Sequence, residues 1–158
     1  MKGKSRPSRL VVLSVDGMRP DFYRRPEEFG LKILNLLELV KGGASADAVE
    51  SIYPTTTYPA HATLVTGVPP RVHGISSHLA SLDPTEKARP WCWFAGALRV
   101  PALWDVARAT GRKVAAISWP VSAGAAIDYN IPEIWDPASG PAAGLRHARP
   151  PLDPGVIF

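Results

Sequence analysis

The feature that most restricts the fold is an apolar run rich in β-branched residues, Leu10–Val15, which ends directly in Asp16 and Gly17. Such a run is typical of a strand buried on both faces of a parallel sheet. In sheets of this kind, ligands bind beyond the carboxyl ends of the strands, where Asp16 would lie. Gly17 allows the backbone to turn sharply there. The start of the chain therefore predicts an α/β fold with a carboxylate at the ligand-binding edge of its sheet.

Helical and strand-like patterns alternate along the following residues. We expect helices over residues 29–41, 59–67 and 101–110, further strands over 44–53 and 113–119, and loops over 68–78 and 79–96. In the first helix, polar residues recur at every third position, and leucines form the inner face. This order of elements indicates an α/β protein with a largely parallel sheet.

Composition and charge exclude several classes of protein. The 158 residues are 46% hydrophobic and 20% charged, which is typical of one globular domain. The net charge of +4 is scattered outside a short basic leader, so no stripe for a nucleic-acid polymer is indicated. Cys92 is the only cysteine, which excludes a disulfide framework and a Cys-based zinc site within one chain. No stretch approaches the roughly 20 apolar residues of a membrane span.

Three segments are predicted along the chain. Residues 1–9 form the basic leader, residues 10–136 form a partial domain, and residues 137–158 form a Pro- and Gly-rich tail that is disordered or frameshifted. The leader has no apolar core behind it, so it is not a signal peptide, and the chain as written is expected to be cytoplasmic.

Hydroxyl groups gather before the predicted helix over 59–67. Pro59 is tolerated in a first helical turn, which places Thr57 at or just before the helix N-terminus. A hydroxyl there can cap the helix, or it can lie where the helix dipole favours an anion. Asp16 and Thr57 each follow a predicted buried strand, so both are expected at one edge of the sheet. A carboxylate beside a hydroxyl can bind a divalent metal that activates the alcohol.

Four ordered motifs carry a resemblance to a known family: Val15-Asp-Gly-Met-Arg-Pro-Asp, Pro54-Thr-Thr-Thr-Tyr-Pro-Ala-His, Leu64-Val-Thr-Gly and His73-Gly-Ile. Together they resemble the type I phosphodiesterase/nucleotide pyrophosphatase family of the alkaline phosphatase superfamily. Residues 100–105 and 127–133 also resemble bacterial members. The resemblance covers about residues 10–135. It implies the N-terminal part of an alkaline-phosphatase-like three-layer sandwich with a mostly parallel sheet.

The resemblance also implies a chemistry. The family hydrolyses small phosphate esters with two zinc ions and a Thr nucleophile, and its full-length members are often exported. Asp16 would ligate the zinc ion that activates the nucleophile. Thr57, itself a zinc ligand, would attack phosphorus and form a phosphothreonine intermediate. His61 and His73 are expected to be structural, whereas Trp91 and Trp93 either pack in the core or form a nucleobase platform.

The chain departs from the family pattern at two points. Relatives carry Asn at the position of His78, which can still donate a hydrogen bond to a phosphate oxygen. The family's later ligands, an Asp with a His four residues on, an Asp-His pair and a further His, have no match here. Asp16 and Thr57 supply at most two of the three protein ligands of a catalytic zinc site. Two hypotheses follow: a zinc-dependent phosphodiesterase, or a truncated, catalytically inactive fragment of one. The sequence does not indicate the substrate's identity or the oligomeric state.

Overall fold

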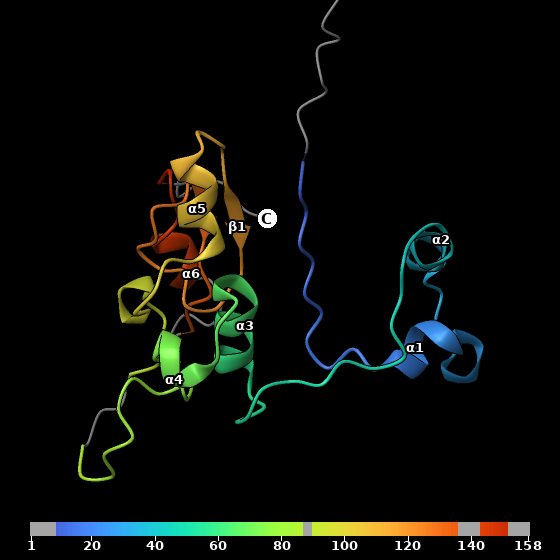
Figure 1. The fold of residues 1–158 in the computed structure, drawn as a ribbon, viewed down its shortest axis with the longest axis horizontal. Coiled ribbons are helices and arrows are strands. Elements are labelled where there is room, and N and C mark those ends of the chain that lie inside the picture. Colours follow the sequence, from blue (N-terminus) through green and yellow to red (C-terminus); the bar gives the residue numbers. More distant parts are fainter. Residues whose placement is uncertain (1–8, 87–89, 136–142, 152–158) are drawn as a thin grey trace, which may run out of the picture. The chain divides into compact units, whose positions relative to one another are not determined.

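The computed structural model describes residues 9–86, 90–135 and 143–151 (Figure 1). The chain divides into two compact units, residues 1–50 and 51–158, and each is described by itself. In the described residues no helix is both long enough and apolar enough to span a bilayer.

The first unit is helical. It contains α1 (Pro20–Arg24), the 3-10 helix η1 (Pro26–Phe29) and α2 (Leu34–Gly42). The rings of Phe22 and Phe29 meet edge to face at 5.0 Å, and the Tyr23 hydroxyl donates to the Ala46 carbonyl at 2.8 Å. The single helix predicted over 29–41 is therefore wrong at its start, because Gly30 adopts a left-handed φ of 64° that ends η1 and separates it from α2.

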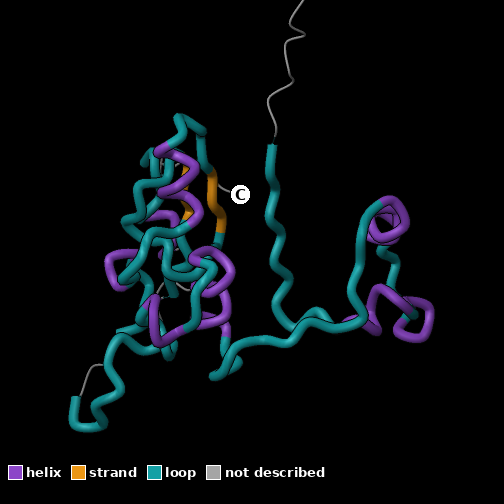
Figure 2. The backbone as a smooth tube through the Cα atoms, in the orientation of Figure 1, coloured by secondary structure: helices purple, strands orange, loops and turns teal. Residues whose placement is uncertain are grey.

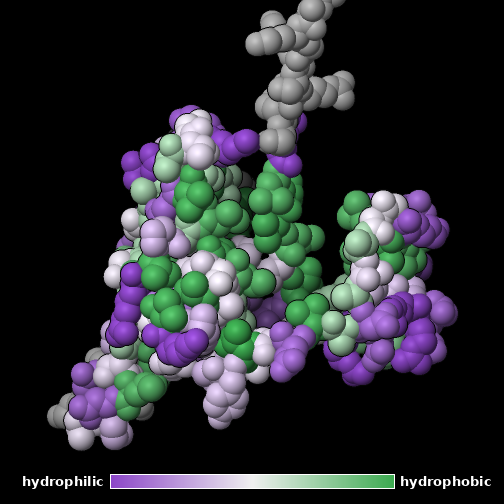
Figure 3. All heavy atoms as spheres, in the orientation of Figure 1, coloured by the Kyte–Doolittle hydropathy of each residue, from purple (hydrophilic) through white to green (hydrophobic). Residues whose placement is uncertain are grey.

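The runs over 10–15 and 44–53 are not assigned as strands, so these two predictions are wrong. A strand requires a ladder of hydrogen bonds to a neighbour, and neither run belongs to a sheet within the described residues of either unit. The backbone of residues 10–15 is extended, but their apolar side chains are exposed, with Leu13 at 81% of its full accessibility (Figures 1 and 3). An apolar pattern indicates that a segment favours burial, but it does not supply the partner.

The second unit combines helices with a small sheet (Figure 2). Its elements are α3 (Thr57–Thr66), α4 (Pro70–His73), the 3-10 helix η2 (Ala95–Ala97), α5 (Leu103–Ala109), β1 (Ala115–Ile117), β2 (Tyr129–Ile131) and α6 (Ala143–Arg146). Strands β1 and β2 are parallel, with Ala115 opposite Tyr129 and Ile117 opposite Ile131. The fold of the described residues is therefore mixed α/β with a two-stranded parallel sheet. The prediction of a loop over 68–78 missed α4.

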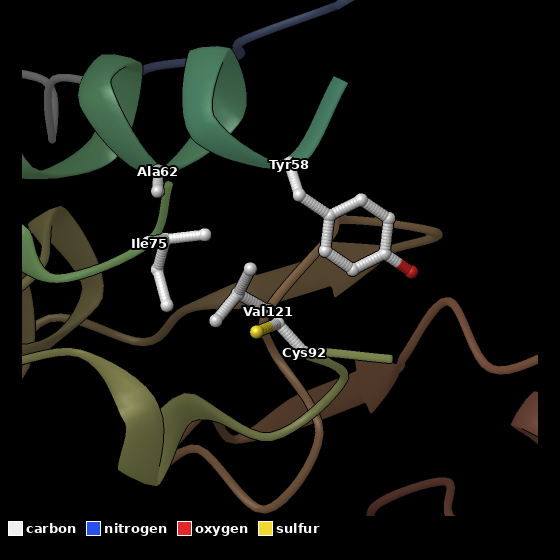
Figure 4. Packing of buried hydrophobic residues seen from close by; sticks show 5 residues of the cluster. All are labelled: Tyr58, Ala62, Ile75, Cys92 and Val121. Carbon is white, nitrogen blue, oxygen red and sulfur yellow. The ribbon is translucent and has the colours of Figure 1, made fainter. Parts of the chain in front are cut away.

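Three apolar clusters form the core of the second unit. The cluster under α3 contains Tyr58, Ala62, Ile75, Cys92 and Val121 (Figure 4). The second lies around Trp104 and Ile127, and the third around Ala123 and Ile134. The first two clusters hold α3 against segments that are far away in the sequence, since Tyr58 and Ala62 belong to the first and Val65 packs against the second.

The connection between β1 and β2 contains an unusual backbone conformation at Val121. Its φ is +58°, in the left-handed region that β-branched residues rarely adopt, and its side chain is 1% exposed. Burial of the side chain in the cluster under α3 is what offsets this strain.

Part of the predicted tail is included in the described structure. Asn130 and Arg149 exchange two backbone hydrogen bonds, each of 2.7 Å, so the chain after α6 returns to β2. Residues 1–8, 87–89, 136–142 and 152–158 lie outside the described residues. The division into leader, domain and tail stays a prediction.

Candidate active site

Thr57 is the first residue of α3, and its position follows from local sequence. Pro59 occupies the first turn, where its missing N–H has no effect on the helical hydrogen bonds. Gly67 ends the helix in a left-handed conformation and donates its N–H to the Thr63 carbonyl at 2.8 Å. The N-cap residue is Thr56, whose side chain makes no capping hydrogen bond with the described residues. The capping role considered for Thr57 is therefore wrong, and its half-buried side chain lies inside the first turn.

The side chain of His61 stabilises the first turn of α3. In His61, Nδ1–H donates to the Thr57 carbonyl at 2.8 Å, and the ring meets Trp119 edge to face at 5.2 Å. The His61 side chain therefore stabilises the turn that begins at Thr57. It acts on the backbone of that turn, as expected for a structural residue.

His73 is fully buried and ties α3 to α4. Its Nδ1 accepts the Ile75 N–H at 3.1 Å, so the proton of the neutral ring is on Nε2, which donates to Thr63 Oγ1 at 3.0 Å. Burial lowers the pKa of His73 below its ordinary value, because the charged ring would lose its hydration. The side chain thus acts as a neutral, directional bridge between two helices.

The structure places the ring of His78 beside the first turn of α3. Its centroid lies 5.0 Å from that of Tyr58, the residue that follows Thr57, and 5.3 Å from that of Trp91. The Cys92 N–H donates to the His78 carbonyl at 2.6 Å and fixes the backbone. His78 and Thr57 are thus in the same unit, and His78 contacts the residue that follows Thr57. A phosphate contact of His78 stays a prediction.

Asp16 lies in the other unit. It occupies an exposed turn in which Met18 N–H donates to the Val15 carbonyl at 3.2 Å, and Gly17 adopts a φ of 72°, as the sequence predicted. Nearby, two arginines contact Asp21, at 2.6 Å from Arg19 and 3.2 Å from Arg25. The hydrogen bond from Arg25, and after it the one from Arg19, lowers the pKa of the Asp21 carboxyl below its ordinary value. The predicted pairing of Asp16 with Thr57 stays a prediction.

Neither unit contains a complete zinc site within its described residues. Over residues 9–86, 90–135 and 143–151, no group of three or more His, Cys, Asp and Glu side chains is placed to hold a metal ion. The two candidate ligands from the sequence lie in different units. The described residues therefore do not fit a three-ligand zinc centre by themselves.

Sequence reasoning missed the surroundings of Tyr58. This residue is 1% exposed, and burial is the first cause that raises its pKa above the ordinary value. The signal was available, because Tyr58 and Ala62 are four residues apart and share one helix face. Glu133, whose carboxylate charge also raises the pKa of Tyr58, gave no comparable signal.

Comparison with known proteins identifies relatives over most of the chain. The family model for type I phosphodiesterase/nucleotide pyrophosphatase matches residues 10–151. Mouse ectonucleotide pyrophosphatase/phosphodiesterase family member 3 is 30% identical over 135 residues, 80% of this chain and 14% of the mouse protein. Venom phosphodiesterase 2 of Crotalus adamanteus is 29% identical over 73% of this chain. A Xenopus laevis bis(5'-adenosyl)-triphosphatase is 37% identical over 42% of it. The matched segment spans about 14% of the length of each of these relatives.

Proposed function

This chain belongs to the type I phosphodiesterase/nucleotide pyrophosphatase family, and on that premise we propose a hydrolase of phosphate esters in which Thr57 is the nucleophile. The supporting observation is the position of Thr57 as the first, half-buried residue of the ten-residue helix α3. The positive end of a helix dipole favours an anion at that point. A phosphoryl group bound there would be within reach of the threonine hydroxyl.

The proposed reaction has two displacement steps. The Thr57 oxygen attacks phosphorus, the bond from phosphorus to the leaving oxygen breaks, and the hydroxyl proton is released. The product is a phosphothreonine and a free alcohol. Water then attacks the same phosphorus, and the bond to the Thr57 oxygen breaks to restore the hydroxyl. His78 would hold a phosphate oxygen by donating a ring N–H.

Zinc enters the proposal through the family alone. Asp16 and Thr57 would be ligands, and a bound ion would lower the pKa of the threonine hydroxyl. Because the described donors do not complete a zinc centre, we assign no step to the metal. The family match and the parallel pair β1–β2 also support the proposal that the chain is the N-terminal part of an alkaline-phosphatase-like three-layer sandwich.

A second candidate function is favoured by the same shortage of donors. The 158-residue polypeptide would be catalytically inactive by itself and would at best bind an anion. The names of the relatives, a venom phosphodiesterase and a triphosphatase among them, support phosphate esters and anhydrides as the ligand class in either case.

One experiment separates these candidates. Hydrolysis of bis(p-nitrophenyl) phosphate is measured with added zinc and with a chelator, for the parent chain, Thr57→Ala and Thr56→Ala. Thr56→Ala is the matched control, since that neighbouring hydroxyl makes no capping hydrogen bond with the described residues. We expect Thr57→Ala to lower turnover at least about a thousandfold and Thr56→Ala to leave it within a few-fold.

The outcomes have different meanings. Zinc-dependent turnover that survives Thr57→Ala excludes the nucleophile role. A phosphorylated threonine located at residue 57 by mass spectrometry supports it directly. A folded chain without turnover in any variant supports the second candidate.

A further inference from the structure

Three buried polar atoms gather beside the first turn of α3. Tyr58 Oη, Trp93 Nε1 and Glu133 Oε2 are each shielded from solvent and form no hydrogen bond of regular geometry with the described residues. Trp93 links them in space, because its side chain packs against the cluster that contains Tyr58 and against the cluster that contains Ile134, next to Glu133. The pKa of Tyr58 is consistent with this placement: burial raises it most, and the charge of Glu133 raises it further.

The packing explains why these atoms converge. The side chain of Trp93 packs against the cluster that contains Tyr58 and also against the cluster that contains Ile134, the neighbour of Glu133. In Figure 4 the hydroxyl oxygen of Tyr58 is on the side of the ring away from Ala62 and Ile75. The apolar cluster therefore packs against the ring of Tyr58, and the hydroxyl group points away from Ala62 and Ile75.

The carboxylate of Glu133 is oriented by a separate contact. Trp135 Nε1–H donates to Glu133 Oε1 at 3.0 Å, which leaves Oε2 as the acceptor on the buried side. The three atoms are complementary: an indole donor, a hydroxyl that both accepts and donates, and a carboxylate acceptor. Leaving such groups unpaired would lower the folding equilibrium constant roughly ten- to hundredfold for each group, so small rotations that pair them are strongly favoured.

We propose that Tyr58 is a positioning residue for Thr57: the Trp93 indole N–H donates to the Tyr58 oxygen, and the Tyr58 hydroxyl donates to Glu133 Oε2. This polar junction (Tyr58, Trp93, Glu133) fixes the first turn of α3 against two loops. That the positioned hydroxyl of Thr57 is a nucleophile rests on the proposed function, whereas the junction itself does not. Small changes in the direction of a nucleophile have large effects on rate, which is why such a residue would be significant.

The first test asks whether Tyr58→Phe lowers the stability of the folded chain. Urea unfolding, followed by tryptophan fluorescence, is measured for the parent chain, Tyr58→Phe, Glu133→Met and the double variant. Within the junction, Tyr58→Phe should lower the folding equilibrium constant at least about a hundredfold, because it leaves two partners unpaired. In the Glu133→Met background the same change should have much less effect. Tyr129→Phe, at a tyrosine that is 58% exposed, is the matched control and should stay within twofold of the parent.

Two results of this measurement would refute the junction. If the Tyr58 hydroxyl has no partner, its removal leaves stability unchanged or increases it, and the junction is refuted. Additive effects of Tyr58→Phe and Glu133→Met also refute it.

The second test measures NMR chemical shifts in the folded state. The five tryptophans give five indole N–H signals in a proton NMR spectrum, and Trp93→Phe assigns one of them. Tyr58→Phe should shift that signal and the amide signal of Thr57, whereas Tyr129→Phe should shift neither. Lost stability changes the unfolded fraction and not the shifts of the folded state, so a purely structural role predicts an unmoved Thr57 signal.

The two proposals fail separately. An unmoved Thr57 amide signal in folded Tyr58→Phe refutes the positioning role, even where the nucleophile test succeeds. A shifted signal in a chain whose turnover survives Thr57→Ala leaves the junction intact and removes the proposed function. If Tyr58→Phe does not fold, Glu133→Met gives the same indole and amide readouts.

Discussion

Lowering the pH should weaken the second unit through His73. The folded state keeps this ring neutral, because Nδ1 accepts the Ile75 N–H and the ring is 0% exposed. Its pKa is therefore lowered from 6.5, whereas the unfolded chain protonates near that value. Below pH 6.5 the unfolded state binds more protons than the folded state, so the free energy of unfolding falls as the pH falls.

The magnitude follows from that difference. Protonation of the unfolded histidine alone lowers the free energy of unfolding by about 1.4 kcal/mol between pH 7.5 and pH 5.5, provided that folded His73 stays neutral. The comparison is with His73→Asn, which does not titrate and whose side-chain oxygen can still accept the Ile75 N–H. The remaining histidines occur in both chains, so their titration cancels in the difference.

The assay is urea unfolding at the two pH values, followed by tryptophan fluorescence. All five tryptophans lie between residues 91 and 135, so the signal reports on the second unit. We expect the parent to lose more than His73→Asn over this interval, by up to about 1.4 kcal/mol. An equal loss in both chains would refute the assignment of His73 as a buried neutral bridge.

Three further predictions concern single sites. Gly74→Ala should destabilise the chain by about 1–2 kcal/mol in thermal unfolding, because φ is +89° there and a Cβ would lie 2.8 Å from Arg99 Nε; an unchanged melting temperature would contradict this. The Val114 N–H is the first cause that lowers the pKa of Asp128 from 3.8, so stability should decline as the pH falls below that value, and Asp128→Asn should flatten this decline in acid unfolding curves. The raised pKa of Tyr58 predicts the opposite sign: stability declines as the pH rises above 10.0, and Tyr58→Phe should remove part of the decline in alkaline unfolding.

Local signals predicted two helices of the second unit, α3 and α5, well. Pro59 and Gly67 predicted α3 within two residues, because a proline in the first turn and a left-handed glycine at the end are local features. Pro101 and Gly111 predicted α5, which begins later, at Leu103. The delay has a visible cause: the Asp105 carboxylate accepts the Ala102 N–H at 2.8 Å and makes Ala102 the N-cap.

Features that depend on distant partners were predicted less well. The strand expected over 113–119 contracts to β1, Ala115–Ile117, since its ladder is only as long as its partner β2. Strand β2 itself was missed, because Asn130 is unfavourable in strands unless its amide is paired, here by donation to the Ser122 carbonyl at 2.8 Å. For the candidate site, the motif placed Thr57 and His78 in one unit, but no local pattern indicates that Glu133 lies beside Tyr58.

The left-handed backbone at Val121 restricts how this site can evolve. Glycine would relieve the backbone but would remove a side chain from the cluster that supports α3, whereas every other residue with a side chain keeps the strain. No single substitution both relieves the backbone strain and keeps a side chain packed in the cluster. Position 121 is thus a local optimum whose escape requires a second, compensating change in the cluster, and we expect the two sites to vary together among related chains.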